Sequence, residues 1–227
     1  MKTENIAGLE CITLRKPTAT KAVILFHGYG ANMHDLYSLH EYLDPAGEWD
    51  WFFPNGPKRI PMGPMYEGRA WFDINVAALE TAMRTGTHRD LSKEVPLHFD
   101  EMIEQQIEFV KEIKLHYPKL VIGGFSQGAM CSAHIALRIP DMVNGVIMMS
   151  SSLIAIEKMP HLTMPPNWTY FQSHGTADPL LSFSGAQALS TKFMESGIHG
   201  EFHSFNGAHE IPVSTVEKAA IYLKKLT

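Results

Sequence analysis

The sequence predicts one α/β domain, built on a doubly wound and mostly parallel sheet with helices on both faces. Two features of the sequence predict this fold. Its short apolar runs are continuous rather than alternating, as is typical of strands buried on both faces of a parallel sheet. Helical patterns follow most of these runs, and strands that alternate with helices imply right-handed crossovers. The chain has 227 residues, which one domain with a substantial core accommodates.

Each predicted buried strand ends at small or polar residues. The four strands are 22–26 before His27-Gly28, 120–122 before Gly123-Gly124, 146–149 before three serines, and 168–171 before Ser173-His174-Gly175. A further strand is expected at 201–205.

Helical spacing accounts for the stretches between the strands. Apolar residues recur at this spacing over 103–113, before Tyr117-Pro118 ends the pattern. Further helices are expected at 129–139, which Pro140 ends, at 186–196, which Gly197 ends, and at 213–226.

Residues 54–97 do not follow this alternation. Prolines interrupt the segment, and methionine and aromatic residues are interspersed among them. So long an irregular connection in a compact domain is usually a functional loop or a lid. We therefore expect a single domain over 1–227, with a lid-like loop at about 54–97.

Composition excludes several classes of protein. The formal net charge of −5 gives no attraction to nucleic acid or anionic lipid. No apolar run approaches the roughly 18 residues of a membrane span, and residues 1–8 lack the apolar run of a signal peptide. Cys11 and Cys131 match no metal spacing, and we expect them to be free buried thiols in a reducing compartment. These features predict a cytoplasmic protein without a metal site.

The candidate nucleophile is Ser126, in Gly124-Phe125-Ser126-Gln127-Gly128. A Gly-x-Ser-x-Gly sequence between a strand and a helix is the nucleophile elbow of the α/β-hydrolase fold. The glycines remove the Cβ atoms that would collide where the strand and the helix pass closely. The alternative is a glycine-rich turn with an idle serine. A dinucleotide site is not predicted, because neither Gly123-Gly124 nor Gly28-x-Gly30 completes G-x-G-x-x-G.

In this fold the acid and then the histidine follow the serine along the chain. His209 is the candidate general base, because it follows the strand at 201–205 in the loop before the last helix. Asp178 lies directly beyond a buried strand and is the candidate acid, in preference to Asp141 at a helix end. The other downstream histidines fit surface or packed positions better, or lack an acidic partner: His134, His161, His174, His199 and His203.

Two backbone N–H groups are candidates for an oxyanion hole. One belongs to Gln127, at the start of the helix after the elbow, and the other to Tyr29, in the glycine-rich loop after the first predicted strand. That loop, taken alone, is equally consistent with a plain tight turn.

Together these motifs resemble the phospholipase/carboxylesterase family, which includes the acyl-protein thioesterases. The resemblance rests on 27–31 with Asp35, on 69–73, on 123–128, on 174–180 and on His209. It implies a hydrolase of acyl esters or thioesters that needs no cofactor, with an acyl pocket around Trp71 and Leu180. The sequence departs from the pattern of this family at Tyr29, where leucine is common, and at Ala129, where glycine is common.

The sequence therefore predicts a serine carboxylesterase for short- to medium-chain acyl esters, and for acyl thioesters, that forms an acyl-enzyme intermediate. An acylated protein or a lysolipid would be an alternative substrate. The other functions that the sequence leaves open are an amide or peptide hydrolase and a non-catalytic ligand-binding relative. A dienelactone-type hydrolase would present cysteine in place of Ser126. The sequence does not decide whether the chain forms a homodimer.

Overall fold

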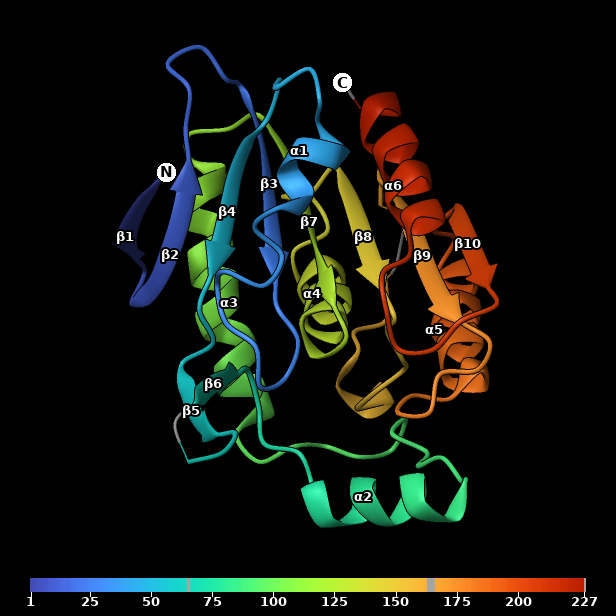
Figure 1. The fold of residues 1–227 in the computed structure, drawn as a ribbon. Coiled ribbons are helices and arrows are strands. Elements are labelled where there is room, and N and C mark those ends of the chain that lie inside the picture. Colours follow the sequence, from blue (N-terminus) through green and yellow to red (C-terminus); the bar gives the residue numbers. More distant parts are fainter. Residues whose placement is uncertain (65, 163–165, 227) are drawn as a thin grey trace.

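The fold is organised by an eight-stranded sheet (Figure 1). The computed structural model describes residues 1–64, 66–162 and 166–226. Six neighbouring strands of the sheet run parallel, and the two N-terminal strands are antiparallel at one edge. The predicted doubly wound, mostly parallel sheet is confirmed. In spatial order the strands are β1 (Lys2–Ile6), β2 (Leu9–Leu14), β4 (Asp50–Pro54), β3 (Lys21–Phe26), β7 (Lys119–Phe125), β8 (Gly145–Met149), β9 (Thr169–Gly175) and β10 (Gly200–Phe205).

Both faces of the sheet are apolar, which explains why its strands are continuous apolar runs. In β3, Ile24 and Phe26 belong to the core on one face, whereas Val23 and Leu25 belong to the core on the other. Successive side chains of a strand point to opposite faces, so a strand covered on both sides is apolar at every position.

Helices cover the two faces. The core on one face includes residues of α3 (Phe99–Lys114), α4 (Gln127–Arg138) and α5 (Phe183–Glu195). The core on the other face includes residues of α1 (Leu39–Leu43) and α6 (Val213–Lys225). Among the described residues, no helix combines the length and apolarity that crossing a bilayer requires. Cys11 and Cys131 are buried free thiols, as expected.

The predicted helices are present, but α3, α4 and α5 begin earlier than expected. α5 begins at Phe183 because the hydroxyl of Ser182 accepts a hydrogen bond from the Gly185 N–H, at 3.0 Å, and caps the first turn. α4 begins at Gln127, directly after Ser126. The apolar patterns of the sequence do not predict α1, β1, β2 and β4.

The prediction that 54–97 is irregular is wrong over two stretches. A hairpin forms from β5 (Lys58–Pro61) and β6 (Glu67–Ala70), and a helix, α2, spans Val76–Thr85. The caps of α2 were visible in the sequence: the Asn75 side chain accepts from the Ala78 N–H, and Gly86 ends the helix at φ 66°. Only Ala82 of α2 is buried, so the apolar periodicity of this helix was weak.

Tyr222 links α6 to two strands of the sheet. Its hydroxyl donates to the carbonyl of Thr169 at 2.5 Å and accepts from the buried N–H of Val146 at 3.2 Å. We expect Tyr222→Phe to lower the free energy of unfolding by about 1–2 kcal/mol, because it leaves these backbone groups without their partner. Urea unfolding measures this loss. Replacement of the exposed Ile221 by Ala on the same helix is the control, and an equal loss in both variants would contradict the assignment.

Candidate active site

Ser126 occupies a strained turn between β7 and α4. Its φ of 53° and ψ of −117° lie outside the regions that non-glycine residues normally adopt. Hydrogen bonds hold the turn on both sides. The Ser126 N–H donates to the Met149 carbonyl at 2.9 Å, and the Ser126 carbonyl accepts from the Met130 N–H at 3.1 Å. This geometry is that of the predicted nucleophile elbow.

Two glycines allow the elbow to form. A Cβ atom at Gly124 would lie 2.3 Å from the Phe26 carbonyl oxygen, and one at Gly128 would lie 2.0 Å from the same oxygen. Neither distance is compatible with a side chain, and the obstacle is backbone rather than a flexible side chain. The start of α4 can therefore approach β3 closely only because both positions are glycine.

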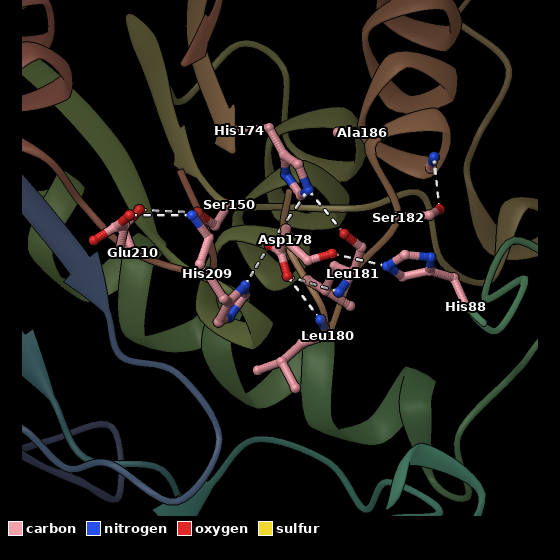
Figure 2. A network of polar contacts seen from close by, with 12 residues as sticks. His88, Ser150, His174, Asp178, Leu180, Leu181, Ser182, Ala186, His209 and Glu210 are labelled. Atoms are coloured by element: carbon pink, nitrogen blue, oxygen red, sulfur yellow. Dashed lines mark hydrogen bonds and ion pairs between the residues drawn. The ribbon is translucent and has the colours of Figure 1, made fainter. Parts of the chain in front are cut away.

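His209 and Asp178 form a hydrogen-bonded pair (Figure 2). The Nδ1 of His209 lies 2.6 Å from Asp178 Oδ2. A carboxylate only accepts, so Nδ1 carries the proton and Nε2 of the neutral ring keeps a lone pair. The other carboxylate oxygen, Oδ1, accepts from the N–H groups of Leu180 at 2.8 Å and Leu181 at 3.0 Å.

The electrostatics of Asp178 favour its ionised form. Burial alone raises the pKa of this carboxyl, but the hydrogen bond and charge of His209 and the two backbone amides outweigh burial. The pKa of Asp178 is therefore lowered from its ordinary value. An ionised Asp178 can orient the His209 imidazole and stabilise its protonated form.

One cavity of about 470 Å³ is lined by both Ser126 and His209. The ring of His209 also lies 4.8 Å, centroid to centroid, from that of Phe125 beside Ser126. Most of the remaining lining is apolar, and it includes Phe72, Ile74, Leu79, Leu91, Val95, Met130, Ile154, Leu180 and Leu181. The structure thus brings Ser126, His209 and, through His209, Asp178 together at the edge of an apolar cavity.

The two candidate oxyanion donors lie at the same cavity. Neighbouring amides are engaged, since the Gly30 N–H donates to the Arg69 carbonyl at 2.8 Å and the Ser126 N–H to Met149. Within the described part of the chain, no hydrogen bond uses the N–H of Tyr29 or Gln127. Both N–H groups are thus available to an oxyanion in the cavity.

The side chain of Gln127 fastens the segment around Trp71 to the elbow. Its Oε1 accepts from the Trp71 N–H at 2.8 Å, and its Nε2 donates to the Phe72 carbonyl at 2.7 Å. Trp71 in turn donates from its indole Nε1 to the His27 carbonyl at 2.8 Å. This role of the Gln127 side chain has no signal in the sequence, because Trp71 and Phe72 are more than 50 residues away along the chain.

The expectation that Trp71 contacts a substrate needs correction. Its side chain is fully buried and packs against Phe26 and His27, so it has no surface facing the cavity. Phe72, the next residue, lines the cavity instead, together with Leu180 as expected.

His27 supports the glycine-rich loop as a neutral imidazole. Its Nε2 accepts from the Gly56 N–H at 2.9 Å, so the proton is on Nδ1, which donates to the Gly28 carbonyl at 2.7 Å. Burial lowers the pKa of His27 to about 4, which keeps the ring uncharged near neutral pH.

His174, which the sequence analysis set aside, is a second histidine at the acid. Its fully buried Nε2 lies 3.4 Å from Asp178 Oδ2 and 3.0 Å from the Leu181 carbonyl (Figure 2). Burial lowers its pKa. Over the ranges that the structure describes, no three histidine, cysteine or acidic side chains are grouped to hold a metal.

A mostly parallel sheet that carries a serine at such an elbow defines the α/β-hydrolase class of fold. Within that class, the chain belongs to the phospholipase/carboxylesterase family, whose sequence model matches residues 8–227. The resemblance found in the sequence is thereby confirmed, and the chain is placed among carboxylic ester hydrolases.

Individual relatives agree with this placement. The chain is 31% identical to acyl-protein thioesterase 1 of Eremothecium gossypii over 80% of this chain and 76% of that protein. It is 29% identical to acyl-protein thioesterase 1 of Aspergillus fumigatus over 94% of this chain and 90% of that protein. Among solved structures it resembles the Bacillus cereus carboxylesterase, with a TM-score of 0.74 at 21% identity, covering 96% and 95% of the two chains. Acyl-protein thioesterase 2 of Zea mays gives a TM-score of 0.72 at 21% identity, covering 95% and 98%. At these identities the two structures show the shared fold.

Buried neutral histidines predict that the protein loses stability in mild acid. Burial lowers the pKa of both His27 and His134 to about 4, whereas an unfolded histidine titrates near about 6.5. Between these values the unfolded chain binds more protons, so the free energy of unfolding falls as the pH decreases. From pH 7 to pH 5 we expect a loss of about 2 kcal/mol for each histidine.

Urea unfolding of His134→Gln at both pH values checks this expectation. Glutamine does not titrate and can still donate to the Ile154 carbonyl, which accepts from His134 Nε2 at 3.0 Å. The variant should therefore lose about 2 kcal/mol less than the unmodified protein on acidification. An identical pH dependence of the two proteins would contradict the assignment.

Proposed function

We propose that the protein is a serine carboxylesterase that hydrolyses short- to medium-chain acyl esters, and acyl thioesters, through an acyl-enzyme intermediate. The observation that carries the proposal is one largely apolar cavity lined both by Ser126 and by His209, whose Nδ1 is hydrogen-bonded to Asp178. The relatives named carboxylesterase or acyl-protein thioesterase support the same chemistry. The latter name supports an acylated protein as one substrate.

In the first step, the Nε2 of His209 takes the proton of the Ser126 hydroxyl while Oγ attacks the carbonyl carbon. The carbonyl oxygen becomes negative and accepts hydrogen bonds from the N–H groups of Tyr29 and Gln127. The C–O or C–S bond to the leaving group then breaks. Protonated His209 gives its proton to the departing alcohol or thiol.

The second step uses the same groups with water as the nucleophile. His209 Nε2 takes a proton from water, and the hydroxide attacks the acyl carbon on Ser126. Collapse of the second tetrahedral intermediate breaks the bond to Oγ, which recovers its proton from His209. Asp178 stays ionised throughout and stabilises the imidazolium in both steps.

The acyl group would occupy the apolar part of the cavity. Met130 lies in the first turn of α4, directly after the elbow, and lines the cavity together with Ser126. Phe72 and Ile154 line the cavity and are almost fully buried, as is Met130. Their burial favours an acyl chain that enters the protein rather than one that lies on its surface.

Replacement of Ser126 by Ala tests the nucleophile directly. We expect loss of p-nitrophenyl ester hydrolysis and of covalent labelling by a fluorophosphonate, because only the oxygen that forms the acyl-enzyme is removed. Ser132→Ala is the matched control, since Ser132 lies on α4 and donates to the Gly128 carbonyl. Labelling that persists in the Ser126 variant, with circular dichroism unchanged, would refute the assignment.

A chain-length series of p-nitrophenyl esters tests the apolar cavity. Each methylene buried contributes about 0.8 kcal/mol, so we expect kcat/KM to rise about 4-fold per methylene until the cavity is filled. Thioesters with the same acyl chains should follow the same order, since the acyl group is shared. Values that are flat or that fall beyond the acetate ester would contradict an acyl site in this cavity.

A further inference from the structure

His88 makes a hydrogen bond that connects two distant parts of the chain. Its Nε2 lies 2.8 Å from the backbone carbonyl oxygen of Asp178, which is 90 residues away (Figure 2). We propose that His88 is a positioning residue, which holds one wall of the acyl cavity against the loop that carries the catalytic acid. The inference rests on the proposed function of Ser126 and Asp178.

The Asp178 carbonyl has no donor in the residues that follow it. Residue 179 is proline and has no N–H, and the N–H groups of Leu180 and Leu181 both donate to the Asp178 side chain. The amides that would otherwise close a turn on this carbonyl are therefore committed to the carboxylate. His88 supplies the missing donor from another part of the fold.

The bond joins two walls of the same cavity. The residues that follow His88 line the cavity, among them Arg89, Leu91 and Val95. On the other side of the bond, Leu180 and Leu181 follow Asp178 and line it as well. The distance between the two walls is thus fixed at the point where the acid loop begins.

Little else holds this part of the wall to the acid loop. α2, which precedes His88, has one buried residue and lies below the carboxyl ends of β7, β8 and β9, apart from the other helices (Figure 1). Arg89 pairs with Glu94 and donates to the Asn75 carbonyl at 3.3 Å. Both contacts are internal to this wall and do not connect it to the acid loop.

Further along the wall, two backbone bonds attach it to the segment after β8. The carbonyls of Leu91 and Ser92 accept from the N–H groups of Ala155 at 3.4 Å and Ile156 at 2.7 Å. These bonds hold residues 91–92 to a different loop. Loss of the His88 bond should therefore loosen 76–90 and leave the later residues of the wall in place.

The chemistry of the bond defines the variants. A carbonyl only accepts, so His88 donates from Nε2, and a glutamine side chain can present an N–H at a similar reach. His88→Phe keeps a planar ring without a donor, whereas His88→Gln keeps a donor without the ring. His98→Phe is the control, because His98 is exposed at the N-terminus of α3 and its ion-pair partner is Glu101 rather than the acid loop. His88 is itself exposed, so none of these changes removes core packing.

Two measurements test the proposal. The first is the ratio of kcat/KM for the octanoate and acetate esters of p-nitrophenol, which reports the acyl wall separately from the chemistry. The second is hydrogen–deuterium exchange over 76–90, which needs no activity. A net hydrogen-bond contribution of about 1 kcal/mol corresponds to a change of about 5-fold in an equilibrium constant or a rate. His88→Phe should therefore lower the ratio about 5-fold and speed exchange over 76–90, while His88→Gln and His98→Phe should stay within about 2-fold of the unmodified protein.

The outcomes separate this proposal from the proposed function. An unmodified protein that cleaves no ester and takes no fluorophosphonate label contradicts the function of Ser126, and exchange over 76–90 still decides the role of His88. His88→Phe with an unchanged ratio and unchanged exchange overturns the positioning role. So does His88→Gln that behaves like His88→Phe, because the effect would then come from the ring and not from the hydrogen bond.

Discussion

The close approach of α4 to β3 is the constraint on which the site depends. The Phe26 carbonyl occupies the space where side chains of residues 124 and 128 would lie, so the chain can turn there only with glycine at both positions. This approach forces Ser126 into a conformation that costs on the order of 1–3 kcal/mol. The buried packing of β7 and α4 on both sides of the turn offsets this cost. As a result, the Ser126 hydroxyl and the Gln127 N–H are both held at the N-terminus of α4, which is the positive end of the helix dipole.

The rest of the site takes its position from this turn through hydrogen bonds. The Gln127 side chain is hydrogen-bonded to the backbone of Trp71 and Phe72, and the Trp71 indole is hydrogen-bonded to the His27 carbonyl. The glycine-rich loop is also bonded to β6, since Arg69 donates to the Ala31 carbonyl at 2.7 Å and accepts from Gly30 at 2.8 Å. The two candidate oxyanion donors therefore belong to one network of backbone bonds, although they are about a hundred residues apart in the sequence. A change at Gln127 would disturb both the oxyanion site and the cavity wall.

The parts of the fold that the sequence predicts are those whose environment is uniform along the element. β3, β7, β8 and β9 are buried on both faces along most of their length, so each contains adjacent apolar residues rather than an alternating pattern. The hairpin strands β5 and β6 have only four residues each, and β5 contains no buried residue, so neither strand gives a clear apolar pattern. α2 buries a single residue and so carries almost no apolar pattern. Ser126, Asp178 and His209 could be chosen from motif and chain order, whereas the contact of His88 with Asp178 has no local signal, because only tertiary structure brings the two residues together.

The candidate catalytic groups and the acyl wall differ in how firmly they are held. Ser126 lies at the carboxyl end of a central strand, and Asp178 and His209 follow two further strands of the same parallel sheet. The ladder between β9 and β10 continues into the loops, where Ala177 donates to the Gly207 carbonyl at 3.0 Å. The segment over 72–96 has no strand in the sheet, and hydrogen bonds attach it to Gln127, to Asp178 and to the loop after β8. Such a wall can change its sequence and its position at a cost of about 1 kcal/mol per bond, whereas a shift of the sheet would disturb the core on both faces. Under the proposed function, the sheet therefore holds the chemical groups in a fixed geometry, whereas the more weakly held segment forms one side of the cavity that receives the acyl chain.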